Sequence, residues 1–359
     1  MTITSASPAE NGSVSEAWYR AASAPMAARP DHGGTDQSAL LLERHYGITG
    51  EIIPLASEVE RTDEIRLSDG RRLILKTSAR PEARDSFAFQ SGVLAELEDS
   101  ADVIVSRVLR TRGGVLMFRD RAICGYLQTR LEGVPLHAEE PTTARVYGTG
   151  QALARLHRAL GRCDPPSARR PVLWHIGCWT RLPSLASHVS AKPRADLVRA
   201  AMADYAAQIA PHLAELDWQI THNDPSPHNM LATDHGTGFI DFGDGGWNPR
   251  LQDLAIAAGH MVTDPDLPLG GAEKIIAGYH SVIPLSDLDR ELLVGLMRAR
   301  QAALILVNAW RSALFPEDAA YINKNVARGE RGLAILSRLD ARSAKAAVTE
   351  ALSQPVSAP

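Results

Sequence analysis

Short runs of hydrophobic residues, bounded by polar and turn-forming residues, recur along the chain after its first forty or so positions. Runs at 52–55, 64–67 and 72–76 have the length and spacing of β-strands, and Ser68-Asp69-Gly70 between the last two predicts a hairpin turn. A fourth run, at 123–131, is also strand-like. We therefore expect a small antiparallel sheet in the N-terminal part of the chain.

Helical periodicity, with apolar residues at every third or fourth position, is found between and after these strands. Helices are predicted over 39–46, 85–97, 146–160, 253–259 and 287–314. The last of them is apolar over most of its circumference, which is typical of a helix buried in the core. A small sheet followed by many helices indicates an α+β fold with two lobes.

The same patterns divide the chain. Residues 1–35 are rich in Ala, Ser, Pro and Gly without a sustained apolar period, and we expect a disordered leader there. The sheet and its first helices define a small N-lobe over 36–130, and the remaining helices define a larger, mainly helical C-lobe over 131–345. Residues 346–359 are expected to form a flexible tail.

The segment 221–245 carries the candidate chemistry. His222-Asn223-Asp224 is followed by Asn229, in the H-x-D-x-x-x-x-N form of a kinase catalytic loop, with Asn223 where protein kinases have arginine. Asp241-Phe242-Gly243 has the form of a kinase metal-binding motif. Phosphoryl transfer requires one carboxylate to orient the attacking hydroxyl and accept its proton. It also requires a second carboxylate with an amide oxygen to hold Mg²⁺ on the nucleotide phosphates, and the two motifs supply this set.

The spacing of the two motifs has a physical rationale. Apolar residues at 230–232 and 239–240 flank a turn-rich segment, so two short strands are expected to form a hairpin. Such a hairpin brings Asn229 and Asp241 to the same end, within reach of one cation. Turn chemistry alone would also explain Asp, Asn, Pro and Gly at these positions. The order and spacing of both motifs favour the catalytic interpretation.

Lys76 ends the third predicted strand, where the lysine of a kinase contacts the α- and β-phosphates of the nucleotide. In kinases this lysine is positioned by an acidic residue on the next helix. On helix 85–97, Gln90 and Glu96 flank the apolar stripe on either side, each about 60° from it. Either side chain is therefore a candidate partner of the lysine.

A phosphate-binding loop is expected between the first two strands, yet the segment 56–63 contains no glycine. Backbone amides of this segment, together with Ser57 and Thr62, are candidates for phosphate binding. Glu58 and Glu60 would then have to point away from the phosphates.

A hinge between the lobes is predicted at 132–135. Backbone groups from Thr129 to Leu131, just before it, would then read the base edge of the nucleotide. His157 and His222 are interpreted as packed, hydrogen-bonded structural residues and not as bases.

Composition narrows the class of protein. The length of 359 residues suggests about two domains, and a net charge of −4 argues against a nucleic-acid partner. Three cysteines without paired spacing argue against a disulfide framework or a zinc site and suit a reducing compartment. No apolar run approaches the ~20 residues of a membrane span and the N-terminus lacks a signal-peptide pattern, so a cytoplasmic location without a membrane partner is expected.

With these motifs, the chain resembles the aminoglycoside phosphotransferase and choline kinase superfamily over about 39–339. Within it, the chain is most similar to the hydroxylysine kinase branch, which includes kinase modules joined to class III aminotransferases. The resemblance is carried by LILKTS, FAFQSGVLAEL, YLQTRLEGVPL, GQALARLH, THNDPSPHNML, FIDFGDGGWNPRLQDLAIA and AGYHSVIPLS. It implies a bilobal kinase-like fold and a branch without a glycine-rich loop.

The resemblance also implies roles for individual residues. Asp224 would be the catalytic base, Asn229 and Asp241 would be Mg²⁺ ligands, and Lys76 would clamp the nucleotide phosphates. Gln90 is a trait of this branch, where other members carry the acidic partner of the lysine one turn along the helix, and this favours the glutamine as the partner. ATP is the default co-substrate, and the branch is also associated with GTP.

Two features bear on the acceptor of the phosphate. The chain has Trp174-His175 where relatives have Trp-Asp, in a region that helps to form the acceptor pocket, so the acceptor is open to differ from hydroxylysine. Helix 287–314 has one polar face, which includes Arg300, Asn308 and Arg311. Buried polar groups need partners. These partners are either internal carboxylates or a carboxylate of the substrate, which guanidinium binds in a bidentate manner.

Three functions are compatible with these features. The first is a kinase that transfers the γ-phosphate of ATP or GTP to a hydroxyl of a small amino acid or amine-containing metabolite, and the branch resemblance favours it. The second is an antibiotic phosphotransferase of the aminoglycoside type that confers self-resistance. The third, a nucleotide-binding pseudokinase, is disfavoured because the lysine, base and metal ligands are all present. A protein kinase is also disfavoured, because no A-P-E element follows Asp241.

Overall fold

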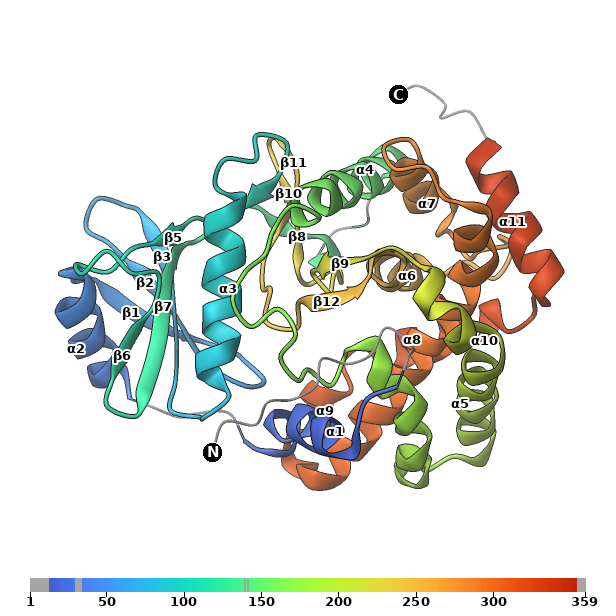
Figure 1. The fold of residues 1–359 in the computed structure, drawn as a ribbon, viewed down its shortest axis with the longest axis horizontal. Helices are drawn as coiled ribbons and strands as arrows, with labels where there is room; N and C mark the ends of the chain where they lie inside the picture. Colours follow the sequence, from blue (N-terminus) through green and yellow to red (C-terminus); the bar gives the residue numbers. More distant parts are fainter. Residues whose placement is uncertain (1–12, 30–33, 139, 141, 354–359) are drawn as a thin grey trace.

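An antiparallel β-sheet lies at one end of the molecule and a larger body of helices lies at the other (Figure 1). The computed structural model describes residues 13–29, 34–138, 140 and 142–353. The expected α+β fold, with a small N-lobe sheet and a larger helical C-lobe, is confirmed. The predicted strands and helices are all present, with small differences at their ends.

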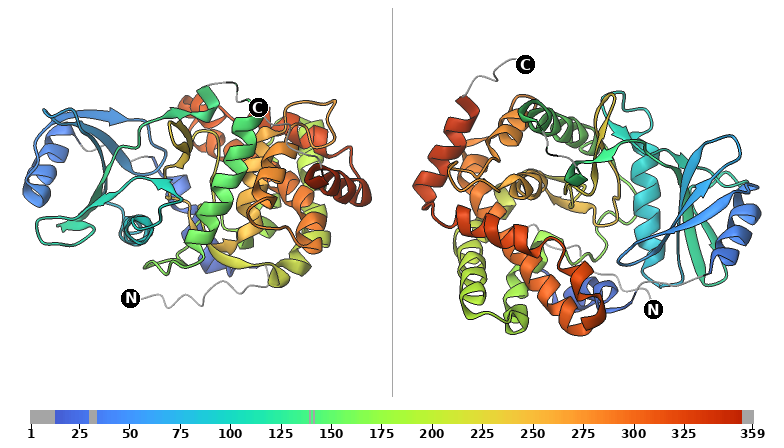
Figure 2. Two further views of the ribbon diagram at one scale, coloured as in Figure 1. Left: turned by 90° about the horizontal axis from the view of Figure 1, so that it is seen from above. Right: turned by 180° about the vertical axis from the view of Figure 1, so that it is seen from behind.

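The N-lobe sheet has the strand order β1-β2-β3-β7-β5, with β6 paired to β7, and all of its pairs are antiparallel. The strands are β1 Glu51–Leu55, β2 Arg61–Arg66, β3 Arg72–Ser78, β5 Val108–Leu109, β6 Phe118–Asp120 and β7 Ile123–Thr129. The helix α2 (Thr35–Tyr46) covers the outer side of this sheet, and α3 (Ala83–Leu97) lies between the sheet and the C-lobe (Figure 2).

Alternation along β3 separates the two faces of the sheet. Leu75 packs with Leu42 of α2 and Leu127 of β7 in a small hydrophobic core. Lys76, one residue further, therefore points to the opposite face, toward α3. The strand register thus brings the ammonium group of Lys76 to the cavity between the lobes.

The C-lobe is built around the long helix α8 (Asp287–Leu314), which contacts α5, α6, α10 and α11. The other C-lobe helices are α4 Thr143–Leu160, α5 Lys192–Asp204, α6 Arg250–Met261, α7 Glu273–His280, α9 Ala319–Ile322, α10 Val326–Leu336 and α11 Ala341–Ser353. Short helical turns are η2 Leu136–Ala138, η3 Ile176–His188, η4 Tyr205–Ile209, η5 Ala210–Glu215 and η6 Pro316–Asp318.

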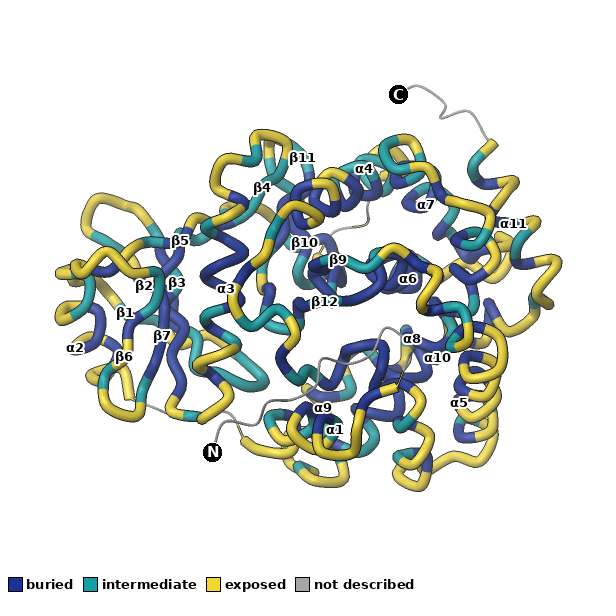
Figure 3. Tube along the Cα trace, viewed as in Figure 1, coloured by how far each residue is buried: buried dark blue, intermediate teal, exposed yellow. Residues whose placement is uncertain are grey.

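By length and composition alone, α8 could cross a membrane. However, 83% of its most apolar stretch is buried inside the protein. Figure 3 shows α6 and α8 as the buried centre of the C-lobe, surrounded by helices with exposed outer faces. The helix is therefore a core element of the folded chain.

Two small sheets hold the segment with the candidate chemistry. The first has the order β4-β11-β10-β8 and combines β4 Ile104–Val105, β8 Val134–Pro135, β10 Met230–Thr233 and β11 Gly236–Phe239. The second pairs β9 Trp218–Thr221 with β12 Gly246–Pro249. Strands that come from both sides of the predicted hinge thus meet around residues 222–246.

Two expectations about the ends of the chain are wrong. The proposed leader contains a helix, α1 (Glu16–Ser23), followed by the turn η1 (Pro25–Ala27). Ser15 caps α1, and Trp18 is buried against the C-lobe, where its ring meets that of His175 edge-on at 5.1 Å. The proposed tail is largely helical, because α11 reaches Ser353 and buries small apolar residues at helical spacing. Residues 1–12, 30–33 and 354–359 lie outside the described part of the chain.

Candidate active site

The catalytic loop, residues 222–229, connects β9 to β10 and is anchored by a buried carboxylate. The backbone N–H groups of His222 and Asn223 donate to the two oxygens of Asp253 in α6, each at 2.7 Å. Sequence reasoning missed Asp253. Its signal was a single acidic residue inside an apolar helical segment, because a buried carboxylate must find donors.

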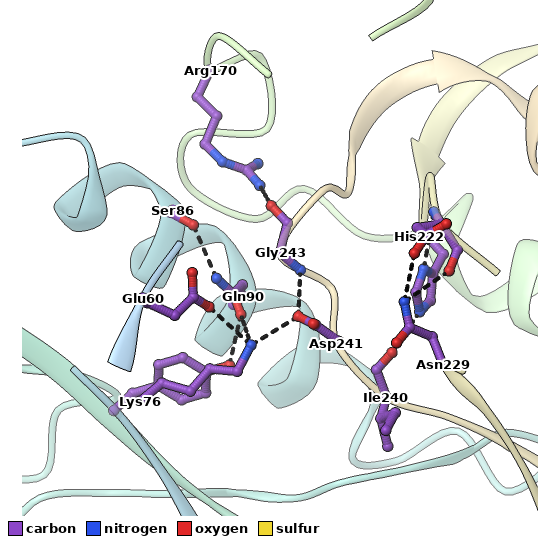
Figure 4. A network of polar contacts seen from close by, with 12 residues as sticks. Glu60, Lys76, Ser86, Gln90, Arg170, His222, Asn229, Ile240, Asp241 and Gly243 are labelled. Carbon is purple, nitrogen blue, oxygen red and sulfur yellow. Dashed lines mark hydrogen bonds and ion pairs between the residues drawn. The ribbon is translucent and has the colours of Figure 1, made fainter. Parts of the chain in front are cut away.

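The two histidines expected to be structural are confirmed in that role. His157 places Nε2 at 3.1 Å from Asp253 and Nδ1 at 2.7 Å from the Tyr279 hydroxyl. Burial lowers the pKa of His157, although the hydrogen bond to Asp253 opposes this effect. His222 lies with Nε2 at 2.9 Å from the carbonyl oxygen of Ile240 and so ties the catalytic loop to the end of the hairpin (Figure 4).

Asp224 lies on the cavity wall between an amide and a guanidinium group. Asn229 donates from Nδ2 to Asp224 Oδ2 at 2.7 Å, and Arg300 of α8 donates from Nη2 to Oδ1 at 3.3 Å. Burial raises the pKa of Asp224, and the charge of Arg300 acts against this rise. A carboxylate that is fixed on both oxygens and has a raised pKa suits a general base.

The predicted hairpin is present as β10 and β11. Met230 is paired with Phe239, and the N–H of Ile240 donates to the carbonyl of Asn229 at 3.0 Å. Asn229 and Asp241 therefore lie at the same end of the hairpin, as the spacing predicted. Asp241 has a positive φ of 63°, which is uncommon for a residue with a side chain. Such strain is found preferentially at functional sites.

Lys76 is at the centre of a polar network (Figure 4). Its Nζ donates to Asp241 Oδ1 at 2.8 Å and to Glu60 Oε1 and Gln90 Oε1 at 3.0 Å each. Burial alone would lower the pKa of Lys76, but Asp241 and Glu60 hold it well above the ordinary value. The surrounding protein would raise the pKa of Asp241, whose side chain is half-exposed in the cavity, but the ammonium of Lys76 holds this pKa below the ordinary value.

The geometry distinguishes the two candidate partners of Lys76. Gln90 is fully buried, receives the Tyr126 hydroxyl on the same oxygen at 2.9 Å, and donates from Nε2 to Ser86 at 2.9 Å. Glu96 instead accepts the backbone N–H of Asp164 at 2.8 Å. Of the two, only Gln90 contacts Lys76.

The donor set around Asp241 fits a divalent cation. The amide nitrogen of Asn229 donates to Asp224. No described residue donates to the Oδ1 of Asn229. Asp241 uses Oδ1 for Lys76 and Gly243, and its Oδ2 is likewise free of donors among the described residues. Carboxylate and amide oxygens are the ligands that Mg²⁺ prefers. No group of three or more His, Cys, Asp or Glu in the described part of the chain would hold a metal alone.

A single cavity of about 620 Å³ joins these residues to the C-lobe. Its wall includes the predicted site residues Ser57, Lys76, Leu131, Trp174, Asp224, Asn229, Asp241, Arg300 and Asn308. Thr129 and Arg311 are not among the lining residues. The N–H of Thr129 instead donates to the carbonyl of Arg107 at 2.8 Å.

The polar face of α8 is satisfied mainly by internal partners. Arg311 forms an ion pair with Glu58, and Asn308 donates to the carbonyl of Ile322 at 2.9 Å. Arg300 pairs with Asp224 and lies over the ring of Trp174, with 4.4 Å between its guanidinium carbon and the ring centroid. Of the two arginines, only Arg300 reaches the cavity.

Phosphate binding by the segment 56–63 would require Glu58 and Glu60 to point away from the phosphates, and the structure does not show this. Both line the cavity, Glu60 against Lys76 and Glu58 against Arg311, with Lys324 at 3.8 Å. The physical reason is that buried cations require nearby counter-charges.

His175 explains the departure from Trp-Asp. It is the N-cap residue of η3, and its Nδ1 accepts the N–H of Gly177 at 3.0 Å, as a capping aspartate oxygen would. Burial lowers the pKa of His175 to about 4, so the ring nitrogen keeps its lone pair at neutral pH. The histidine is thus a structural cap. Of the two residues, Trp174 lines the cavity and His175 does not.

A lysine, a carboxylate suited to act as a base and two metal-type ligands lie together in one interlobe cavity, an arrangement typical of phosphotransferases of the kinase-like class. The model of the phosphotransferase enzyme family matches residues 51–292, and the chain belongs to this family. The relatives that it matches are kinases that act on hydroxyl groups, and the chain is accordingly an enzyme of this kind.

Hydroxylysine kinase from Danio rerio is 24% identical over 332 residues, which are 83% of this chain and 89% of the relative. Homoserine kinase from Brucella ovis is 25% identical over 298 residues, which are 81% of this chain and 89% of the relative. Among solved structures, the amicoumacin kinase hAmiN in complex with AMP-PNP and Ca²⁺ matches with a TM-score of 0.65 at 12% identity. That match covers 86% of this chain and 95% of the other, and at this identity it shows the fold alone.

Proposed function

We propose that this protein transfers the γ-phosphate of ATP or GTP to a hydroxyl group of a hydroxylated amino acid or a related small amine, in a reaction that depends on Mg²⁺. The observation that carries the proposal is the single cavity in which Lys76, Asp224, Asn229 and Asp241 meet, with Arg300 on its C-lobe side. The match to hydroxylysine and homoserine kinases supports an amino-acid acceptor.

Each of these residues has a chemical role in the proposal. Lys76 holds the α- and β-phosphates, and Leu131 offers backbone groups to the base. Asn229 and Asp241 would hold Mg²⁺, which neutralises charge on the phosphates. Asp224 accepts the proton of the acceptor hydroxyl while the hydroxyl oxygen forms a bond to the γ-phosphorus. The bond between the γ-phosphorus and the β–γ bridging oxygen breaks, and the nucleoside diphosphate leaves.

The size of the cavity favours a small acceptor over an aminoglycoside. Its volume of about 620 Å³ falls within the ordinary range for one small-molecule site, yet it must hold both the nucleotide and the acceptor. The turn η1 narrows it further, because Pro25 and Met26 form part of the wall. Little room is left for a substrate of several sugar rings.

A transfer assay tests the proposal directly. The purified protein is incubated with Mg²⁺ and ATP or GTP, and with 5-hydroxylysine, L-homoserine, 1-amino-2-propanol or kanamycin. We expect phosphate transfer to at least one of the first three. Transfer to kanamycin alone would replace the proposal with the antibiotic function, and transfer to none of the four would overturn it.

A further inference from the structure

Asp244 is a carboxylate on the cavity wall that has no hydrogen-bond or ion-pair partner for its side chain among the described residues. The charges that act on it most strongly are those of Asp224, Asp241 and Glu58, each of which has a cationic group within 4.0 Å. Arg170 and Arg300 on the same cavity wall attract Asp244, but neither lies within 4.0 Å of it, and no described residue donates a hydrogen bond to its carboxylate. Burial and these like charges raise the pKa of Asp244 well above its ordinary value.

Asn223 ties the segment that carries Asp244 to the catalytic loop. The side chain of Asn223 donates from Nδ2 to the backbone carbonyl of Asp244 at 3.0 Å, and Asn223 directly precedes Asp224 in the chain. Asn223 has a positive φ of 66°, a conformation that asparagine tolerates better than most residues. The loop after Asp241 is therefore tied to the residue beside the base.

The same asparagine joins the aromatic wall to this arrangement. Gln252 of α6 donates from Nε2 to Asn223 Oδ1 at 2.5 Å and to the backbone carbonyl of Trp174 at 3.1 Å. Trp174 lines the cavity, and Arg300 lies over its ring. An aromatic wall and a carboxylate are thus held in one frame around Asp224.

A second, independent observation indicates that a polar ligand belongs in this cavity. His260 at the end of α6 lines the cavity and is only 7% exposed, yet no described residue forms a hydrogen bond with its ring. Arg300 is 5% exposed, and its Nε also lacks a partner in the described structure. Buried polar groups without partners are rare in folded proteins unless a ligand or water satisfies them.

We propose that Asp244 binds the ammonium group of the acceptor, on the carbon next to the reacting hydroxyl, and thereby selects 1,2-amino alcohols. The inference rests on the proposed function, because it takes the acceptor hydroxyl to lie against Asp224. An ammonium group supplies both the positive charge and the hydrogen bonds that Asp244 lacks. Asn223 ties the backbone of Asp244 to the residue before Asp224, and both carboxylates line the same cavity, so an ammonium near the reacting hydroxyl is the group best placed to meet Asp244.

The test compares two acceptors that differ in this one group, 5-hydroxylysine and 5-hydroxynorleucine, which lacks the ammonium beside the hydroxyl. For the wild type, we expect kcat/KM with 5-hydroxynorleucine to be lower by about 100-fold, as for a buried charge pair that loses one partner. Asp244→Asn should lower kcat/KM for 5-hydroxylysine by a similar factor, mainly through KM, and should change that for 5-hydroxynorleucine less than about threefold.

Two controls separate this role from others. Asp234→Asn, an identical change at an exposed turn, should leave every value unchanged. The Kd for the nucleotide and the Mg²⁺ concentration at half-maximal rate should be the same in Asp244→Asn as in wild type. A tenfold shift in the Mg²⁺ requirement, without a change in acceptor KM, would make Asp244 a metal ligand and overturn the inference.

The comparison of 5-hydroxylysine with 5-hydroxynorleucine uses the wild-type protein alone, so its result does not depend on whether Asp244→Asn folds. Equal kcat/KM of wild type for the two acceptors would overturn the ammonium role while leaving the proposed function in place. If the wild type phosphorylates neither of them nor 1-amino-2-propanol, the proposed function fails for amino alcohols, and the inference fails with it.

Discussion

The nucleotide-facing and acceptor-facing halves of the cavity differ in how completely their charges are paired. On the nucleotide side, Lys76 is surrounded by Glu60, Gln90 and Asp241 at 2.8–3.0 Å. On the acceptor side, Asp244 and His260 have no hydrogen-bond or ion-pair partner for their side chains in the described structure. The paired charges on the nucleotide side hold Lys76 in one position for the phosphates. The unpaired groups on the acceptor side can form new hydrogen bonds and ion pairs with an acceptor of matching chemistry. The following predictions test this difference.

The largest expected effect separates the base from the metal site. Asp224→Asn should leave nucleotide affinity nearly unchanged but lower kcat by about 10²–10⁴-fold, because the hydroxyl proton loses its acceptor. Asp241→Asn should instead weaken the binding of the Mg²⁺-nucleotide complex itself. Titration calorimetry and steady-state kinetics measure both quantities. Equal losses of nucleotide affinity in the two variants would contradict this division of roles.

The next prediction concerns Arg300 and an amino-acid acceptor. If Arg300 binds the acceptor carboxylate, Arg300→Met should cost roughly 2–5 kcal/mol of acceptor binding by leaving that carboxylate unpaired, while nucleotide affinity stays the same. Arg298→Met on the same helix is the matched control, because Arg298 donates only to the backbone carbonyls of Leu336 and Leu339 and does not line the cavity.

The decarboxylated acceptor distinguishes two roles for Arg300. With this amine, wild type and Arg300→Met should behave alike if the arginine binds the carboxylate. If both acceptors lose activity equally in the variant, Arg300 acts only through Asp224, to which it donates at 3.3 Å.

A smaller effect should follow from pH. Burial, and next the charge of Arg300, lowers the pKa of His260 to about 3, so the folded protein keeps this ring neutral while the unfolded chain protonates it near pH 6.5. The contribution of the neutral ring to the free energy of unfolding is therefore fully present above about pH 6.5 and is lost progressively as the pH falls below it. Between pH 7 and pH 5 the loss is about 2 kcal/mol.

Urea unfolding of the wild type and of His260→Gln at the two pH values measures this contribution. The variant should lose about 2 kcal/mol less than the wild type on acidification. His235→Gln, at an exposed position, should follow the wild-type profile. Parallel profiles for wild type and His260→Gln would contradict the neutral state of the buried ring.

The smallest expected effect lies in the closed network. Gln90→Ala should raise the nucleotide KM by about tenfold, because a hydrogen bond to a charged group is lost while Glu60 and Asp241 still hold Lys76. Glu96→Gln should have little effect, since Glu96 accepts a backbone N–H elsewhere. The reverse order of the two variants would show that the lysine adopts another partner during turnover.

The nucleotide half could be predicted from the sequence because its parts lie in short, regularly spaced segments. A hairpin fixes the relation of Asn229 to Asp241, and the alternation of a strand fixes the direction of Lys76. These local rules act over a few residues. The long core helix was predicted with the correct ends for a similar reason, since its caps and apolar period are local features.

The acceptor half could not be predicted in this way because its residues come together only through packing. Asp244 depends on Asn223 and Gln252, which lie in separate segments. Glu58 meets Arg311, 253 positions further along the chain, so the sequence does not show that each neutralises the other. The helix α1 was mistaken for part of a disordered leader because its single buried tryptophan gains its stability from the surface of the C-lobe.

The location of α1 also affects how the lobes can move. The described residues 13–29 lie on the C-lobe, the N-lobe is formed by residues from 34 to about 130, and the chain continues in the C-lobe after 130–134. Arg80 of the N-lobe also contacts this N-terminal segment, donating to the carbonyl oxygen of Pro25 at 3.1 Å. Two lobes joined by a single segment can rotate about it in any direction, whereas two lobes joined at two points rotate mainly about the line between those points. Entry of the nucleotide and release of the products should therefore occur by a hinge rotation of the lobes about the line between the Arg80–Pro25 contact and the segment 130–134.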